Sequence, residues 1–293
     1  MKNYKGIIFA VLSMVFLALR SLIDKKGSME VQSPLYYSLG TLIFSTIFIS
    51  IFVFIKQKNE ITVSLKSLSF RSTALLILTG IIASGIVFIL RFEGIQESTA
   101  SFAALSQVIS TGTTVLLAFL IFRDNLPRIG YILLPIIFFF TYIISVGDFR
   151  IESIRKGDFL ILISAVFIGV TNIIAQHLSA RTKSSIISFS RFFFGIPIIL
   201  GVIFYSEPQG VEFSKIIWMF FSALVLTLNV ISFYEAIKYS GASFASSLLV
   251  VGPALAMFLS FIFLGERFNN LQYLSALLVM VSGVILIQSK AKD

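Results

Sequence analysis

The sequence contains no cysteine and one histidine, and only 13% of its 293 residues are charged. Without cysteine the chain forms no disulfide, Fe–S cluster or thiol nucleophile. His177 has no acid beside it, and it is too isolated to build a zinc or haem site, so we expect no metal and no cofactor. A Gly-rich phosphate loop of the G-x-x-x-x-G-K-[ST] kind is also missing. These absences argue against an enzyme and against an ATP-driven motor.

Apolar residues dominate instead: 57% of the chain is hydrophobic and the mean hydropathy is +0.97. Because hydrocarbon offers no water to backbone groups, apolar runs of about 20 residues predict membrane-spanning helices. Ten runs of this kind occur, at residues 6–23, 34–55, 73–90, 98–122, 129–146, 157–176, 185–205, 216–237, 242–264 and 271–288. The expected fold is all-α and integral to the membrane, with ten transmembrane helices. The longest connection, 56–71, reads as a basic linker.

An internal repeat divides the chain. Residues 93–131 align without a gap with residues 235–273, and eleven positions are identical. Chance similarity of composition would give roughly three or four matches, so duplication is the better explanation. The repeat predicts two five-helix halves, 1–150 and 151–293, that form one membrane unit. Because five is odd, the second copy enters the membrane from the other side, and the halves form an inverted repeat typical of transporters.

Basic residues indicate the orientation. Lys and Arg are more numerous on the side of the two termini, which predicts cytoplasmic termini in a multi-pass protein of the plasma or inner membrane. The net charge of +9 agrees with this topology and with contact to anionic headgroups, so membrane lipids are expected partners. No basic cluster carries interleaved aromatic residues, and we expect no nucleic-acid partner.

One stretch carries a family pattern. Residues 241–268 combine a small-residue helix, Pro253 near its middle and Leu264-Gly265-Glu266 at its end. Together with the ten-span layout, this stretch resembles the EamA-like branch of the drug/metabolite transporter superfamily. The resemblance implies a secondary transporter that exports small metabolites such as amino acids. It also implies alternating access through a central cavity lined by spans three, four, eight and nine.

The first half departs from that pattern. Thr111 stands at the position of Pro253, and Arg123-Asp124-Asn125 stand where the second half has Gly265-Glu266-Arg267. Proline removes one backbone donor from a helix, so we expect a kink in the ninth span and a complete hydrogen-bond ladder in the fourth.

Arg191 is the strongest single candidate for a functional residue. It lies about two turns into the seventh span, where a guanidinium is costly unless it pairs or faces a wet cavity. The first half has Gly40 at the equivalent position. Contact with substrate or a gate and a structural pairing role remain equally weighted alternatives.

Further candidates are uncharged polar residues within spans. An amide bridges helices or binds a polar solute, and a tyrosine ring can hold a part-apolar solute. The candidates for substrate binding or gating are Arg191, Asn172, Asn229, Gln107, Tyr37 and Pro253. Few carboxylates accompany them, which favours neutral, zwitterionic or anionic metabolites over simple cations.

Three carboxylates are candidates for coupling or for ending helices. Glu93 and Glu235 correspond in the repeat and end spans at opposite faces, while Glu266 closes the Leu-Gly-Glu motif. A partly desolvated carboxylate suits a coupling proton, whereas groups at an interface are ordinarily hydrated. Proton coupling, exchange and facilitated diffusion all remain open. The alternative function is a non-transporting membrane scaffold or partner subunit, and the small-residue helix faces also suit a homodimer.

Overall fold

The computed structural model describes residues 2–31, 33–66, 68–96, 100–147, 155–206 and 215–292, and these contain helices and no strand. The elements in chain order are α1 (Lys2–Val31), α2 (Pro34–Lys66), α3 (Phe70–Gly80), the π-helix η1 (Ile81–Ile86), α4 (Val87–Gln96), α5 (Ala100–Phe122), α6 (Gly130–Val146), α7 (Lys156–Ser179), α8 (Ser184–Phe193), α9 (Ile196–Ser206), α10 (Ile216–Ser240), α11 (Ala242–Leu249), α12 (Gly252–Leu264) and α13 (Asn270–Lys292).

Eight helical segments in the described residues are long and apolar enough to cross a membrane. Two further apolar helices, Ser106–Phe122 and Gly130–Val146, are shorter. The all-α class is confirmed and the chain is a multi-pass membrane protein, whereas the count of ten spans and the inverted repeat stay predictions. One expectation was wrong: α2 continues to Lys66, so residues 56–66 extend a helix and only a short connection precedes α3.

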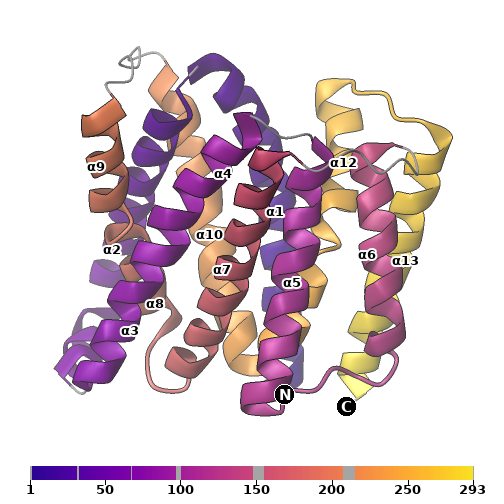
Figure 1. Cartoon of the computed structure of the whole chain (residues 1–293). Helices are drawn as coiled ribbons and strands as arrows, with labels where there is room; N and C mark the ends of the chain where they lie inside the picture. The colour runs from indigo at the N-terminus through magenta and orange to yellow at the C-terminus, as the bar shows by residue number, and fades with distance from the viewer. Residues whose placement is uncertain are drawn as a thin grey trace.

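The helices stand side by side, and both chain termini lie at the same end of the bundle (Figure 1). We call this end the terminal end and the other the opposite end. Helix α1 packs along α10, α5 along α7, and α6 along α13. Each of these pairs joins a helix from residues 1–150 to one from residues 151–293. The two predicted halves are therefore interleaved in one unit.

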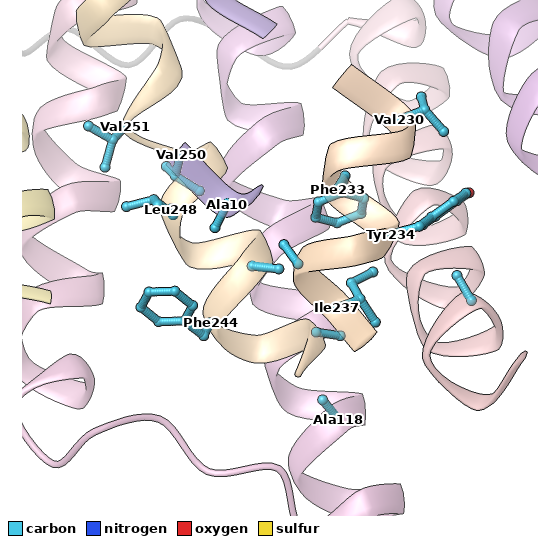
Figure 2. Packing of buried hydrophobic residues seen from close by; sticks show 14 of the residues in the cluster. Ala10, Ala118, Val230, Phe233, Tyr234, Ile237, Phe244, Leu248, Val250 and Val251 are labelled. Atoms are coloured by element: carbon cyan, nitrogen blue, oxygen red, sulfur yellow. The ribbon is translucent and has the colours of Figure 1, made fainter. Parts of the chain in front are cut away.

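Small buried side chains let the central helices approach closely. Ala10 of α1, Ala236 of α10 and Ala245 of α11 are at most 1% exposed. Figure 2 shows large side chains from α10 and α11 around Ala10, including Phe233 and Leu248. Because lipid tails are as apolar as the protein core, close packing rather than escape from water holds such helices together. The same packing fixes the polar side chains described next.

Candidate functional site

Three of the spans are interrupted. The span Phe70–Arg91 contains the π-helix η1, Ser184–Ser206 is divided by a turn at residues 194–195, and Ala242–Leu264 is divided by a turn at residues 250–251. Pro253 occupies the first turn of α12, where its missing N–H costs no helical bond. The expected interruption of the ninth span is confirmed, and α5 is continuous as expected. In transporters with inverted repeats, broken spans lie at the solute site.

Two of these interruptions pack against each other. A side chain at Gly195 would bring its Cβ to within 2.5 Å of the Ser84 Cβ in η1. One turn earlier, the Ser190 hydroxyl donates to the Leu76 carbonyl oxygen at 2.7 Å, and a Cβ at Gly80 would lie 2.4 Å from the Ser190 carbonyl oxygen. Glycine at both positions is therefore what permits the contact. A π-helix of this kind is frequent at functional sites.

Arg191 lies in the last turn of α8, immediately before the interruption, and about 10 Å along the helix from its start at Ser184. Its Nη1 donates to the Tyr234 hydroxyl at 3.1 Å, and its guanidinium carbon is 6.0 Å from the centre of the Tyr234 ring. Tyr234 is 1% exposed and points away from the side of α10 that faces α11 (Figure 2). Arg191 is half-buried and, within the described part of the chain, no carboxylate pairs with it. Within the described residues, a tyrosine and no carboxylate therefore accompanies this charge.

The two candidate asparagines join helices. Asn172 donates to the Thr114 hydroxyl at 3.1 Å and so connects α7 to α5. Asn229 donates to the carbonyl oxygen of Ser13 at 2.7 Å and to its hydroxyl at 3.0 Å, while the Ser13 hydroxyl donates back to the Asn229 carbonyl oxygen at 3.2 Å. These contacts are of the kind expected for helix bridging. The Asn229 side chain donates two hydrogen bonds and the Asn172 side chain donates one.

Gln107 behaves differently. Its side chain is half-buried on α5 and makes no hydrogen bond to any of the residues that the structure describes. One turn further along, the Thr111 hydroxyl donates to the Ser246 carbonyl oxygen of α11 at 3.3 Å. Thr111 thus contacts the interrupted ninth span. In that span, Pro253 stands at the repeat position that corresponds to Thr111. Among the candidate amides, Gln107 is the one whose side chain makes no hydrogen bond within the described residues.

Tyr37 belongs to a polar cluster at the opposite end. Its hydroxyl donates to Asp24 Oδ1 at 2.8 Å, and the Ser222 hydroxyl donates to the same oxygen at 2.5 Å. The other oxygen of Asp24 lies 2.9 Å from Arg20 Nε, an ion pair one turn apart on α1. Arg91 interacts electrostatically with this pair. The Arg20–Asp24 spacing is visible in the sequence, but the contribution of Ser222 is not, because it comes from α10.

A second cluster joins helices at the terminal end, and the sequence pattern did not assign its central residue a role. Asp124 follows α5, and its Oδ2 accepts hydrogen bonds from Gln176 Nε2 at 3.3 Å and from the Ser243 backbone N–H at 3.1 Å. The carboxylate thus caps the start of α11. Gly241 has φ +84°, and a Cβ there would lie 2.3 Å from Asp124. The Gly-Ala-Ser sequence at the start of a helix is the sequence feature that could have indicated this capping contact.

The candidate carboxylates lie apart from one another. Glu93 is exposed near the end of α4, and Glu235 is half-buried in α10, five residues before its end. Glu266 is half-buried in the connection after α12, and its backbone N–H donates to the Ser260 carbonyl oxygen at 3.4 Å. The structure gathers none of the three around Arg191, and their proposed roles in coupling stay predictions.

Comparison with known proteins identifies relatives of this chain. The sequence pattern of the EamA-like transporter family matches residues 4–146 and again residues 155–288. An uncharacterized transporter of Methanothermobacter thermautotrophicus is 24% identical over 314 aligned positions, covering 100% of this chain and 88% of that protein. A solved protein crystal structure has the same fold, with TM-score 0.75 and 10% identity over 96% of this chain and 95% of that one. This is a family of membrane transporters and not of enzymes. The chain belongs to the EamA-like transporter family.

Proposed function

We propose that this membrane transporter is a secondary exporter of small metabolites that carry a carboxylate, such as amino acids and related compounds. The observation that carries the proposal is Arg191, a half-buried guanidinium with a tyrosine hydroxyl as its partner and no paired carboxylate in the described residues. A charge inside a membrane bundle is costly and marks a solute pathway by default. A carboxylate solute would neutralise it.

The chemistry of the site suits such a solute. A guanidinium has five N–H donors in a fixed fork, and a carboxylate binds two of them at once. Tyr234 accepts from Nη1, which leaves other donors available. Arg191 also immediately precedes the interruption between α8 and α9, which packs on η1. Backbone groups freed at interrupted helices supply further polar contacts, and Gln107 offers an amide on α5 that makes no hydrogen bond within the described residues.

Alternating access is supported by the Asp124 cluster. Asp124 follows α5 of the first predicted half, whereas Gln176 and Ser243 belong to the second, so their contacts hold the two halves together at the terminal end. With cytoplasmic termini in the plasma membrane, that end faces the cytoplasm, and these contacts would close it. Release of these contacts would open it to solute. The repeat counterpart of Asp124 is Glu266, which follows α12 at the opposite end.

Two alternatives for the energy source of transport are proton coupling and solute exchange. Proton coupling would use Glu93 and Glu235, of which Glu235 is the more buried. Exchange of one solute for another requires no titrating group. Replacing both residues by glutamine separates the alternatives: proton coupling predicts that the pH dependence of flux disappears, whereas exchange predicts an unchanged profile.

Ligand-dependent thermal stabilisation of the purified protein tests the substrate class. The panel pairs each amino acid with its decarboxylated amine and adds nucleosides and sugars. We expect stabilisation by amino acids, none by the matching amines, and loss of the response in Arg191→Gln. Arg71→Gln removes an exposed arginine and serves as the control. A response to amines equal to that to amino acids would contradict recognition of a carboxylate.

A further inference from the structure

A pocket of about 770 Å³ opens at the terminal end, away from the three interrupted spans. It lies between the connection that joins α5 to α6 and the last turns of α13, two helices that pack side by side at one edge of the bundle (Figure 1). The residues around it are Leu126, Pro127, Arg128, Ile129, Ile285, Gln288 and Ser289. Transport through the centre of the bundle does not use this pocket.

The polar groups of the pocket suit an anion. Arg128 is exposed and, within the described ranges, has no paired carboxylate. Gln288 and Ser289 add an amide and a hydroxyl. The helix α6 starts beside Ile129 without a side-chain cap, so its positive dipole end lies at this pocket residue, although the Gly130 and Ile132 N–H groups already donate to the Pro127 and Ile129 carbonyl oxygens. Lys290, next in sequence to Ser289, lies 5.8 Å from the Phe244 ring and adds positive charge nearby.

Two exposed apolar stripes run along the helices from this pocket. On α6 the stripe begins at the pocket residue Ile129 and continues through Ile132, Ile136 and Phe139. On α13 it begins beside the pocket residue Gln288 and continues through Val284, Val281, Leu277 and Leu274. Both follow helical spacing, so each forms one continuous face. Their lengths are about 15 Å and about 21 Å, and half of a bilayer hydrocarbon core is about 15 Å.

We propose that this pocket binds the phosphate of an anionic diacyl phospholipid, whose two acyl chains lie along the apolar stripes of α6 and α13. A water-soluble phosphate compound would bind the hydrogen-bond donors of the pocket but would not contact the apolar stripes. Two stripes of about half-bilayer length match two chains of one lipid. Basic pockets between helices at the cytoplasmic side of a membrane bind anionic headgroups in this way.

Native mass spectrometry of the full chain, titrated with phosphatidylglycerol or phosphatidylcholine, tests the proposal. We expect phosphatidylglycerol to bind about tenfold more tightly, because both lipids present the phosphate but the choline cation of phosphatidylcholine offsets its charge and is repelled by Arg128 and Lys290. Arg128→Gln should remove the preference. Arg267→Gln, which removes an exposed arginine in the connection between α12 and α13, should retain it.

Each of four outcomes would overturn the proposal. These are equal affinity for the two lipids, a preference that survives in Arg128→Gln, competition by glycerol phosphate as strong as by the intact lipid, and a lipid-free dimer in which a second copy covers the pocket. Because Arg128 is exposed, its replacement leaves the packed interior intact, and monodisperse elution of the variant verifies this.

Discussion

The Asp124 carboxylate accepts a hydrogen bond from the Ser243 backbone N–H at 3.1 Å, and the Asp124 carbonyl oxygen accepts one from the Ser243 hydroxyl at 3.1 Å. These residues are 119 positions apart, and their contact ties the end of α5 to the start of α11. One side chain on a short connection thus ties the two predicted halves together at the terminal end of the bundle. Under the proposed alternating access, opening this end would require these bonds to break.

Asp124→Ala should make the terminal end open more readily. Because the chain has no cysteine, a single introduced thiol reports accessibility without interference. Ser246→Cys places that thiol at a position that is 2% exposed and whose hydroxyl has no hydrogen-bond partner. We expect its maleimide labelling rate to rise several-fold when Asp124→Ala is added. Ser206→Cys, at an exposed position, should label at the same rate with and without Asp124→Ala. Unchanged labelling of Ser246→Cys would contradict a closing role for Asp124.

Gly195→Ala should destabilise the protein. The added Cβ would lie 2.5 Å from the Ser84 Cβ and 2.9 Å from the Ser84 backbone carbon, so α8, α9 or η1 must shift. Overpacking of this kind costs about 1–3 kcal/mol of unfolding free energy. Gly201→Ala in α9 is the matched control, because no atom lies within 4 Å of its added Cβ. Alanine is the better helix former, so the control should be neutral or up to about 1 kcal/mol more stable. Equal losses at both positions in reversible denaturation would disprove the close contact.

The Asn229–Ser13 contact should appear as a coupling in a double-mutant cycle. Asn229→Leu and Ser13→Ala remove the bond between amide and hydroxyl, and hydrogen bonds between membrane helices average about 0.6 kcal/mol. We therefore expect a coupling energy of that size in unfolding measurements. Ser164→Ala is the control, because Ser164 is the repeat counterpart of Ser13 and bonds within its own helix. The stability losses of Ser164→Ala and Asn229→Leu should simply add. If the coupling energy between these two variants were as large as that between Ser13→Ala and Asn229→Leu, the cycle would not report the direct bond.

Asp24→Asn should lower stability by about 1–3 kcal/mol, the range for a hydrogen bond to a charged group. The substitution removes the ion pair with Arg20 and weakens the bonds from Tyr37 and Ser222. Glu93→Gln neutralises an exposed carboxylate near the end of α4 and should change stability by less than about 0.5 kcal/mol. Thermal unfolding of the two variants compares them directly. If Asp24→Asn lowered stability as little as Glu93→Gln, then Asp24 would not stabilise the polar cluster at the opposite end.

Composition and periodicity predicted the helices well, because a backbone in hydrocarbon must pair within its own segment. Pro253 correctly marked the interruption of the ninth span. The interruptions at η1 and at residues 194–195 were not anticipated, although Gly195 precedes Pro197 in the second of them. The π-helix has no proline, and its place depends on packing against Ser190 and Gly195, which lie more than one hundred residues later.

The faces of the helices were harder to predict than their positions. In a soluble helix the apolar side turns inward, but here both the lipid-facing and the buried sides are apolar, so hydropathy does not orient a helix. Arg191 was recognised as exceptional because its charge is costly in lipid, whereas nothing in the sequence linked it to its partner Tyr234. Tyr37 was chosen as a solute contact, yet its hydroxyl binds Asp24. Asp124 was noticed only as a departure from the motif.

Efflux from proteoliposomes loaded with the twenty standard amino acids tests the central claim, that the Arg191 charge recognises the transported solute. Release is quantified by mass spectrometry for wild type, Arg191→Lys, Arg191→Gln and the exposed control Arg71→Gln, at matched amounts of folded protein. We predict release of one or more amino acids by wild type and by Arg71→Gln. Arg191→Lys should be partly active and Arg191→Gln about 10- to 100-fold slower, the equivalent of one lost charge-assisted contact. Release by Arg191→Gln at the wild-type rate, or none above empty vesicles by wild type, would contradict the account.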